Sequence, residues 1–299
     1  MVKSKVEKVN IYESVTARLI EALEKGVNPW RKPWNCLQYG VLRNADTNRP
    51  YRGLNTLLLN MATMAGGYSD PRWLTYKNAE KLGGTVKKGE KGTQIIFWNF
   101  LSVDKNNTDP DAKDKKIPFA RAYTVFNVEQ CEGIKVAPLD VPQTVQGEVN
   151  EIAERIIANV GVISKGTRAF YSPSSDTVTL PPAAIFESLE LYYSTFYHEA
   201  AHRTGHPSRL DRDFSGRFGD EAYAFEELVA EIGASFLCSC TGIPLEKMRH
   251  PEYIASWLKV LKNDNKAIFT AAGKAQNAVD FILDELGAPV DVDEELLAA

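Results

Sequence analysis

Two of the four histidines, His198 and His202, lie four residues apart in the segment His198-Glu199-Ala200-Ala201-His202. On a helix this spacing places both imidazoles on one face, where they can bind the same metal ion. Neutral imidazoles suit Zn²⁺, and a catalytic zinc site has three protein ligands and a water. The apolar run 191–197 before the motif and the acidic stretch 226–231 after it favour a zinc site over two solvated surface histidines.

The third metal ligand is expected from Glu226-Glu227-Leu228-Val229-Ala230-Glu231, which is predicted to be helical. Glu227 and Glu231 would lie one turn apart on one face of that helix. Glu227 is preferred as the ligand, because this spacing of acids is typical of peptidases whose third ligand is glutamate. Glu231 would then accept a hydrogen bond from His198 and fix its tautomer. The opposite assignment of Glu227 and Glu231 stays open, and Glu226 is expected to be solvated.

Glu199 is the candidate general base. Its carboxylate would take the proton of a zinc-activated water as that water attacks an amide carbonyl, and would pass it to the leaving amine. Tyr223 could donate a hydrogen bond to the oxyanion. A packed tyrosine with its hydroxyl at the surface is the alternative. His206 is not expected to be a ligand, because the metzincin pattern places its third histidine where Ser208 stands.

The elements that would position these residues follow from the hydrophobic period of the second half. Residues 189–203 and 221–240 are predicted to be the helices that carry the motif and the glutamates. Short strands at 168–171 and 176–180 would precede them. The second could be an edge strand that pairs with an extended peptide, or a purely structural edge. Further helices are expected at 149–159, 251–261 and 265–286.

The first half has a different pattern. Strands at 94–102 and 120–128, rich in β-branched and aromatic residues, are predicted to pair across a polar loop. Helices are predicted at 9–25, 55–64 and 75–82. The fold class is therefore α+β, with a small antiparallel sheet in the first half and a mainly helical second half. A proline-containing stretch without helical or strand period divides the chain into domains 1–134 and 149–299, joined by a linker at 135–148.

Net charge also separates the two halves. Residues 1–130 have 21 Lys and Arg against 13 Asp and Glu, whereas the remainder has 14 against 26. A basic first half predicts contact with a polyanion. No run of 18 apolar residues exists, so no membrane span is expected, and the four cysteines lack both CxxC spacing and the density of a disulfide framework. These features predict a cytoplasmic protein.

Aromatic and basic residues are interspersed in the first half, which contains four of the five tryptophans. Cationic grooves with aromatic side chains bind single-stranded nucleic acid, because each base stacks on a ring for about 1–3 kcal/mol. No basic recognition helix is predicted, so single strands are preferred over duplex. The alternative is that the tryptophans are core and the lysines merely solvated. The candidate DNA-binding residues are Trp30, Arg31, Lys32, Trp34, Arg43, Arg49, Tyr51, Arg52, Lys87, Lys88 and Lys91.

With both halves considered, the chain resembles the ArdC family of plasmid-borne antirestriction proteins. The segments that carry the resemblance are 27–34 (VNPWRKPW), 51–55 (YRGLN), 84–92 (GTVKKGEKG), 125–128 (VFNV), 198–206 (HEAAHRTGH), 223–231 (YAFEELVAE) and 253–258 (YIASWL). The resemblance implies an N-terminal single-stranded-DNA-binding domain and a C-terminal zincin-like metallopeptidase domain. Such proteins are carried on conjugative plasmids and protect incoming DNA from restriction. The chain is also similar to the N-terminal part of plasmid primases, without their polymerase portion.

The predicted function is antirestriction, with single-stranded DNA and a protein substrate in the recipient cell as partners, Zn²⁺ as cofactor, and neither a membrane nor a nucleotide cofactor. One alternative is a single-stranded-DNA-binding protein whose zinc only braces the fold. Glu199 argues against it, because a structural site needs no general base and usually closes with a fourth ligand. The other alternative is a metallopeptidase whose basic half recognises an acidic protein.

Overall fold

The computed structural model describes residues 10–27, 29–30, 41–102, 116–139, 147–216, 220–244 and 253–287, with only the backbone at 98–102 and 116–119. The first-half elements are α1 (Ile11–Glu24), β1 (Arg43–Asn44), α2 (Leu54–Gly66), β2 (Arg72–Thr75), α3 (Tyr76–Lys81), β3 (Thr85–Val86), β4 (Thr93–Ser102), β5 (Lys116–Asn127), the 3₁₀ helix η2 (Val128–Gln130) and β6 (Cys131–Glu132). The second-half elements are α4 (Glu151–Val160), β7 (Ile163–Ser164), β8 (Phe170–Ser172), β9 (Thr177–Leu180), the 3₁₀ helix η3 (Ala183–Ile185), α5 (Leu189–Arg203), α6 (Glu221–Thr241), α7 (Ile254–Asn263) and α8 (Ala267–Asp284). The predicted α+β class is confirmed.

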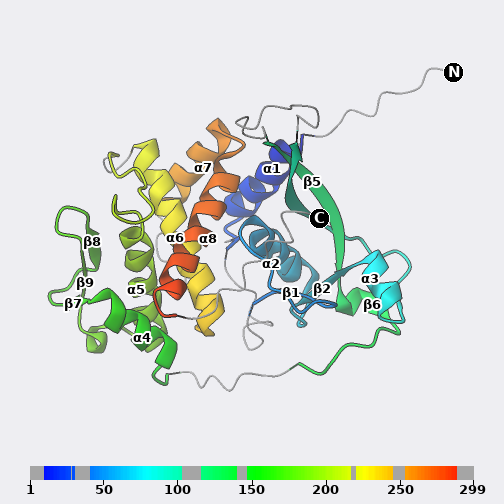
Figure 1. Cartoon of the computed structure of the whole chain (residues 1–299), viewed down its shortest axis with the longest axis horizontal. Coiled ribbons are helices and arrows are strands. Elements are labelled where there is room, and N and C mark those ends of the chain that lie inside the picture. Colours follow the sequence, from blue (N-terminus) through cyan, green and yellow to red (C-terminus); the bar gives the residue numbers. More distant parts are fainter. Residues whose placement is uncertain are drawn as a thin grey trace, which may run out of the picture.

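The first half is built on a four-stranded sheet in the order β1-β2-β5-β4. The predicted pair β4 and β5 is antiparallel, in register from Thr93 opposite Val125 to Ser102 opposite Lys116. It forms the long curved ribbon on the right of Figure 1. β2 was not predicted, and its last residue, Thr75, was assigned to the helix predicted at 75–82. The predicted loop 104–116 lies outside the described residues except for Lys116, which begins β5.

The second half is a helical bundle flanked by a small sheet. α6 packs against α5, α7 and α8, and the three-stranded sheet β7-β9-β8 lies beside α5. Figure 1 shows this sheet at the left margin of the molecule. β9 is the central strand, parallel to β7 and antiparallel to β8, so the prediction of an edge strand at 176–180 is wrong. β8, which contacts α5, lies at one edge of this sheet.

Small residues let the helices of the bundle approach closely. A Cβ atom added to Gly233 of α6 would lie 3.3 Å from the Cβ of Ala201 on α5 and 3.8 Å from the carbonyl oxygen of Ala275 on α8. Interaxial distance depends on side-chain size at the contact, so larger residues here would push the helices apart. This packing sets the distance between the histidines of α5 and the glutamates of α6.

The largest hydrophobic core crosses the predicted domain boundary. Val15, Leu19 and Leu23 of α1 belong to the same buried cluster as Trp257 of α7. Trp30 packs edge-on against Trp257, with ring centroids 5.3 Å apart. Figure 1 shows α1 and α2 between the bundle and the β4–β5 ribbon. A fragment that ends at the predicted linker would therefore expose the apolar faces of both helices.

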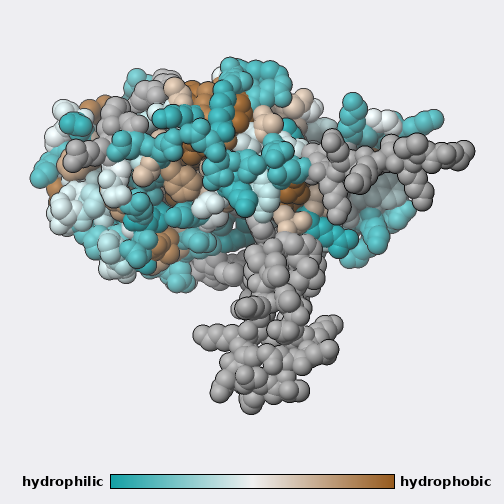
Figure 2. All heavy atoms as spheres, turned by 90° about the horizontal axis from the view of Figure 1, so that it is seen from above, coloured by the Kyte–Doolittle hydropathy of each residue, from teal (hydrophilic) through white to brown (hydrophobic). Residues whose placement is uncertain are grey.

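The surface seen in Figure 2 is mainly hydrophilic, with hydrophobic residues in small groups. Within the described ranges, no helix is both long enough and apolar enough to cross a membrane.

Candidate functional site

His198 and His202 on α5 and Glu227 on α6 form a buried cluster of metal-ligating groups. The two Nε2 atoms are 3.1 Å apart, and Glu227 oxygens lie 3.4 Å from that of His198 and 3.6 Å from that of His202. Tetrahedral ligands at bond lengths of about 2.0–2.1 Å are themselves about 3.4 Å apart. The three side chains therefore fit one divalent ion of the size of zinc.

The remaining ring nitrogen of each histidine faces a carboxylate on α6. Nδ1 of His198 lies 3.5 Å from Glu231, and Nδ1 of His202 lies 3.1 Å from Glu226. Such contacts hold the proton on Nδ1 and leave Nε2 for a metal. Of the two assignments left open by the sequence, these distances favour Glu227 as the ligand and place the carboxylate of Glu231 beside Nδ1 of His198. The expectation that Glu226 is solvated is wrong, because its side chain is only 7% exposed.

Glu226 is buried because Arg212 neutralises it. Nε and Nη2 of Arg212 donate to both oxygens of Glu226, at 2.9 and 2.8 Å. The same guanidinium donates to the carbonyl of Ala201 and to the hydroxyl of Thr204 at the end of α5. Burial raises the pKa of Glu226, but hydrogen bonds from His202 and Arg212 outweigh burial and lower it. Sequence reasoning missed Arg212, since an arginine in a loop gives no sign that it will be buried.

Glu199 lies beside the cluster without belonging to it. Its side chain comes from α5, and its Oε2 accepts a hydrogen bond of 2.8 Å from the backbone N–H of Tyr171 on β8. β8 is itself tied to the loop after α5, because the Tyr171 hydroxyl and Arg209 both donate to Asp176. The edge strand therefore fixes the carboxylate predicted to be the general base. Tyr171 was not predicted, because it acts through its backbone.

Tyr223 lies one turn before Glu227 on α6, and its hydroxyl contacts Glu227 and the hydroxyl of Tyr253, 3.1 Å away. Burial, Tyr253 and Glu227 all raise the pKa of Tyr223, so the phenol stays protonated and donates to the carboxylate. This contact steadies the predicted third ligand, and donation by Tyr223 to an oxyanion stays a prediction. Tyr253 was missed, because its sequence neighbourhood has no metal-binding pattern.

The charges of the cluster are coupled. Burial lowers the pKa of His198, but Glu227 and Glu231 outweigh it and raise that pKa to about 10. Burial raises the pKa of Glu227, but His198 and its neighbours lower it to about 2. A metal ion that binds here must therefore displace a proton from His198. His206 is outside the cluster, with its Nδ1 2.8 Å from the hydroxyl of Ser208.

Comparison with known proteins shows the family of this chain. Residues 9–126 match the family model of the N-terminal domain of anti-restriction factor ArdC, and residues 151–274 match that of a zincin-like metallopeptidase. The metal-free crystal structure of antirestriction ArdC protein from plasmid R388 is 36% identical and superposes with a TM-score of 0.78, covering 94% of this chain and 100% of that one. The chain belongs to the ArdC family. The Mn(II)-bound structure of the R388 protein is 37% identical, with a TM-score of 0.76, over 92% of this chain and 98% of that one.

Two sequence relatives extend the comparison. An uncharacterized protein of Sinorhizobium fredii, y4eC, is 39% identical over 282 residues, which is 91% of each chain. A DNA primase TraC from Escherichia coli is 40% identical over 291 residues, which is 91% of this chain but 27% of the primase. The ArdC chain therefore spans about a quarter of that primase.

One of the two tryptophans predicted to stack on DNA in this ArdC chain, Trp30, is part of the core. Trp30 has no exposed surface and packs against Trp257, so its ring cannot receive a base. The prediction for Trp30 is therefore wrong, and Trp73 is equally buried. Arg31, Lys32 and Trp34 lie outside the described residues.

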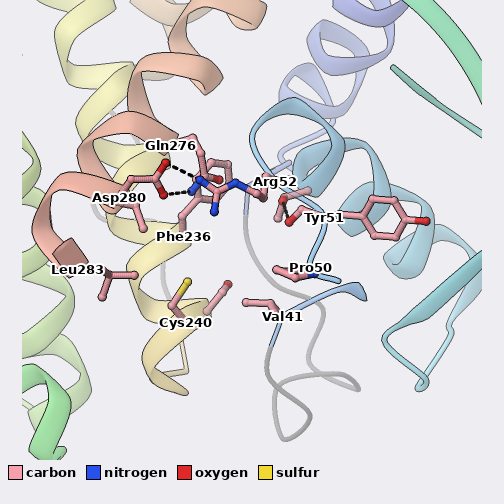
Figure 3. Close-up of a pocket in the computed structure, with 12 residues that line it drawn as sticks. Val41, Pro50, Tyr51, Arg52, Phe236, Cys240, Gln276, Asp280 and Leu283 are labelled. Carbon is pink, nitrogen blue, oxygen red and sulfur yellow. Dashed lines mark hydrogen bonds and ion pairs between the residues drawn. The ribbon is translucent and has the colours of Figure 1, made fainter. Parts of the chain in front are cut away.

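Tyr51 and Arg52 serve packing between the two halves. Figure 3 shows both at a pocket of about 200 Å³ between the segment before α2 and helices α6 and α8. Arg52 is paired with Asp280 of α8. The phenol of Tyr51 points away from the pocket into a second core cluster, and burial raises its pKa to about 12. The hydroxyl of Tyr51 is buried and its ring is partly buried, so the prediction that Tyr51 contacts DNA stays a prediction.

Most of the other described basic residues that are predicted to bind DNA are exposed to solvent. Arg43 is partly buried and donates to the side chain of Asn48. Arg49 is exposed, as are Lys87, Lys88 and Lys91 in the turn before β4. Contact between this turn and phosphates therefore stays a prediction.

Proposed function

We propose that this ArdC protein binds single-stranded DNA with its first half and hydrolyses a peptide bond at the cluster of His198, His202 and Glu227, with Zn²⁺ as the ion. The observation that carries the proposal is the cluster itself. Its three ligand atoms have the separations of a single metal site, and a carboxylate outside the ligand set, Glu199, lies beside them.

A bound divalent ion supplies Lewis acidity, which activates a water and a carbonyl group. Glu199 removes the proton from the attacking water as the new C–O bond forms. The carboxylate then gives that proton to the amine as the C–N bond breaks. The N–H of Tyr171 holds one oxygen of Glu199, which leaves the other oxygen to exchange the proton. Tyr223 and Tyr253 keep Glu227 in place during these steps.

The ligand count favours hydrolysis over a purely structural metal. Structural zinc sites usually have four protein ligands, whereas catalytic sites keep one position open. Among the described residues, the cluster has three members, and Glu199 is held by a different partner. An open position beside a fixed base is the arrangement that metal-assisted hydrolysis requires.

The DNA-binding part of the proposal rests on the first half. Its net charge is +8 over residues 1–130, and its basic turn is exposed. Single-stranded DNA that enters a recipient cell would be covered by this half, while hydrolysis in the second half would act on a protein that threatens the DNA. Both parts serve antirestriction.

The test of hydrolysis compares the wild-type protein with Glu199→Gln in a proteome-wide cleavage assay in recipient cells. Glutamine cannot accept the proton, and loss of a general base costs roughly 10²–10⁴-fold in rate. The variant should keep the fold and its zinc. If conjugation into a restricting host also falls, hydrolysis is part of protection. Protection that survives in Glu199→Gln but is lost with the metal ligands would mean that the metal is structural.

The test of DNA binding uses the full chain, because α1 and α2 pack into the core of the second half. Affinity for an oligonucleotide should fall linearly on a log–log plot as salt rises, because phosphate contacts release counterions. Acidic peptides of equal charge should bind weakly. Tight binding of the peptides and none of the oligonucleotide would contradict the proposal and favour recognition of an acidic protein.

A further inference from the structure

One face of the β4–β5 ribbon changes along its length from packed core to open aromatic surface. Residues opposite each other in an antiparallel pair share a face, and Ile95 lies opposite Tyr123 while Phe97 lies opposite Arg121. Ile95 is buried in the cluster that contains Trp73. Phe97 and Tyr123 are only partly buried, and Arg121 is exposed. The ribbon therefore extends its aromatic face beyond the core.

The side chains on this face hold one another in place. The rings of Phe97 and Tyr123 pack edge to face, with centroids 5.3 Å apart and planes at 85°. The guanidinium carbon of Arg121 lies 5.2 Å from the centroid of the Tyr123 ring. Edge-to-face and cation–π contacts fix the rings without covering all of their surface. The result is a surface with two aromatic rings packed against each other and one cation beside them.

We propose that Phe97, Tyr123 and Arg121 form the platform on which this protein stacks the unpaired bases of single-stranded DNA. Aromatic rings on adjacent strands, together with arginine, are the chemistry on which exposed bases stack. Duplex DNA does not fit, because its bases are already stacked on one another. This inference rests on the proposed DNA binding and moves the stacking role from the buried Trp30 to the ribbon.

The position of the basic turn supports a nucleic-acid ligand. Lys87, Lys88 and Lys91 are exposed immediately before β4 begins at Thr93. At a rise of about 3.3 Å per residue, Lys91 and Phe97 are roughly 20 Å apart along the chain. A single strand that follows the ribbon can therefore place phosphates on the turn and bases on the platform.

The test measures binding of the full chain to two labelled oligomers by fluorescence anisotropy, a dT 12-mer and an abasic 12-mer with the same phosphates. The wild-type protein should bind dT about tenfold more tightly, because only dT can stack. Phe97→Leu and Tyr123→Leu keep apolar contact with the core but lack the aromatic face, so they should lose this preference and keep their affinity for the abasic oligomer. Tyr123→Phe should retain the preference.

A matched control comes from the same half. Tyr76 on α3 is 51% exposed, so Tyr76→Leu removes an accessible ring outside the platform and should change nothing. Crosslinking of wild-type protein to an oligomer with 5-iododeoxyuridine, followed by peptide mapping, gives a readout that does not depend on the folding of any variant. The crosslinks should fall on Phe97 or Tyr123.

The outcomes separate the platform from DNA binding itself. If the wild-type protein binds neither oligomer at low salt, the proposed function is wrong. If it binds dT but the two leucine variants keep the preference for dT, or the crosslinks fall outside β4 and β5, the platform is wrong while DNA binding stands.

Discussion

The metal cluster in the second half and the ribbon face in the first half are built in opposite ways. His198, His202 and Glu227 are buried on two neighbouring helices, and each is held by a further side chain. Phe97 and Tyr123 lie on strands and are defined by the ring surface that stays accessible. A site that consists of particular residue types at helical spacing can be recognised in a sequence. A site that depends on exposed aromatic rings cannot, because the sequence does not distinguish an exposed aromatic residue from a buried one.

Loss of the ligands should give the largest effect. The double variant His198→Ala/His202→Ala removes two of the three groups of the cluster, so it should retain no stoichiometric zinc after gel filtration. Metal content by mass spectrometry checks this, with His206→Ala as the control that keeps its zinc. Zinc retained at one ion per chain by the double variant would show that the ion binds elsewhere.

Trp30→Ala should test the corrected role of the first predicted stacking residue. Removal of a fully buried indole from the core costs about 3–5 kcal/mol of unfolding free energy. Urea denaturation measures the loss, and Lys88→Ala, at an exposed position, should have almost no effect on stability. A stable Trp30→Ala variant with weakened DNA affinity would return the stacking role to Trp30.

Glu226→Gln should lower metal affinity, and its effect should be smaller than those of the two preceding changes. An amide cannot match the carboxylate as acceptor for His202 and leaves the buried Arg212 poorly neutralised. Loss of such an outer contact typically costs about 10–100-fold in metal affinity. Competition with a chelating dye measures it, and Glu221→Gln, on the exposed first turn of the same helix, is the control. Equal metal affinities of the two variants would show that Glu226 does not contribute to the metal site.

Much of the fold was predictable because long amphipathic helices and the β4–β5 pair repeat their pattern over many residues. The predicted 189–203 helix has the bounds of α5, and the predicted 221–240 helix ends one residue before α6. β1, β3 and β7 have two residues each, so no period exists to detect. Nor did composition show that α1 packs against the second half, because an apolar helix face does not specify its partner.

The candidate site was predictable to a similar extent as the fold. The spacing of the histidines within α5 and of the glutamates within α6 identified His198, His202 and Glu227 as candidate ligands. Arg212 and Tyr253 approach from other elements, so their contacts depend on tertiary structure. In the first half, tryptophan content pointed to stacking, but the tryptophan rings whose burial is described, Trp30 and Trp73, lie in the core.

Arg209→Gln should give the smallest effect, and one that depends on pH. Hydrogen bonds from Arg209 lower the pKa of Asp176 from 3.8 to about 2. Because the folded pKa lies below the unfolded one, this stabilisation is present above about pH 4 and is lost as the pH falls towards 2. The pair is partly exposed, so the loss at pH 7 should be about 1 kcal/mol or less. Denaturation at pH 7 and pH 3 should show the difference between variant and wild type shrinking at the lower pH, and a constant difference would contradict this origin.

Hydrolysis and base stacking are two separate activities on one folded chain, and reciprocal measurements on Glu199→Gln and Tyr123→Leu test this separation most directly. Each variant is assayed for proteolysis and for the preference for dT over the abasic oligomer. Glu199→Gln should lose hydrolysis by about 10²–10⁴-fold and keep the preference. Tyr123→Leu should lose the preference and keep hydrolysis. If either folded variant loses both activities, the two sites are not separate and the account is contradicted.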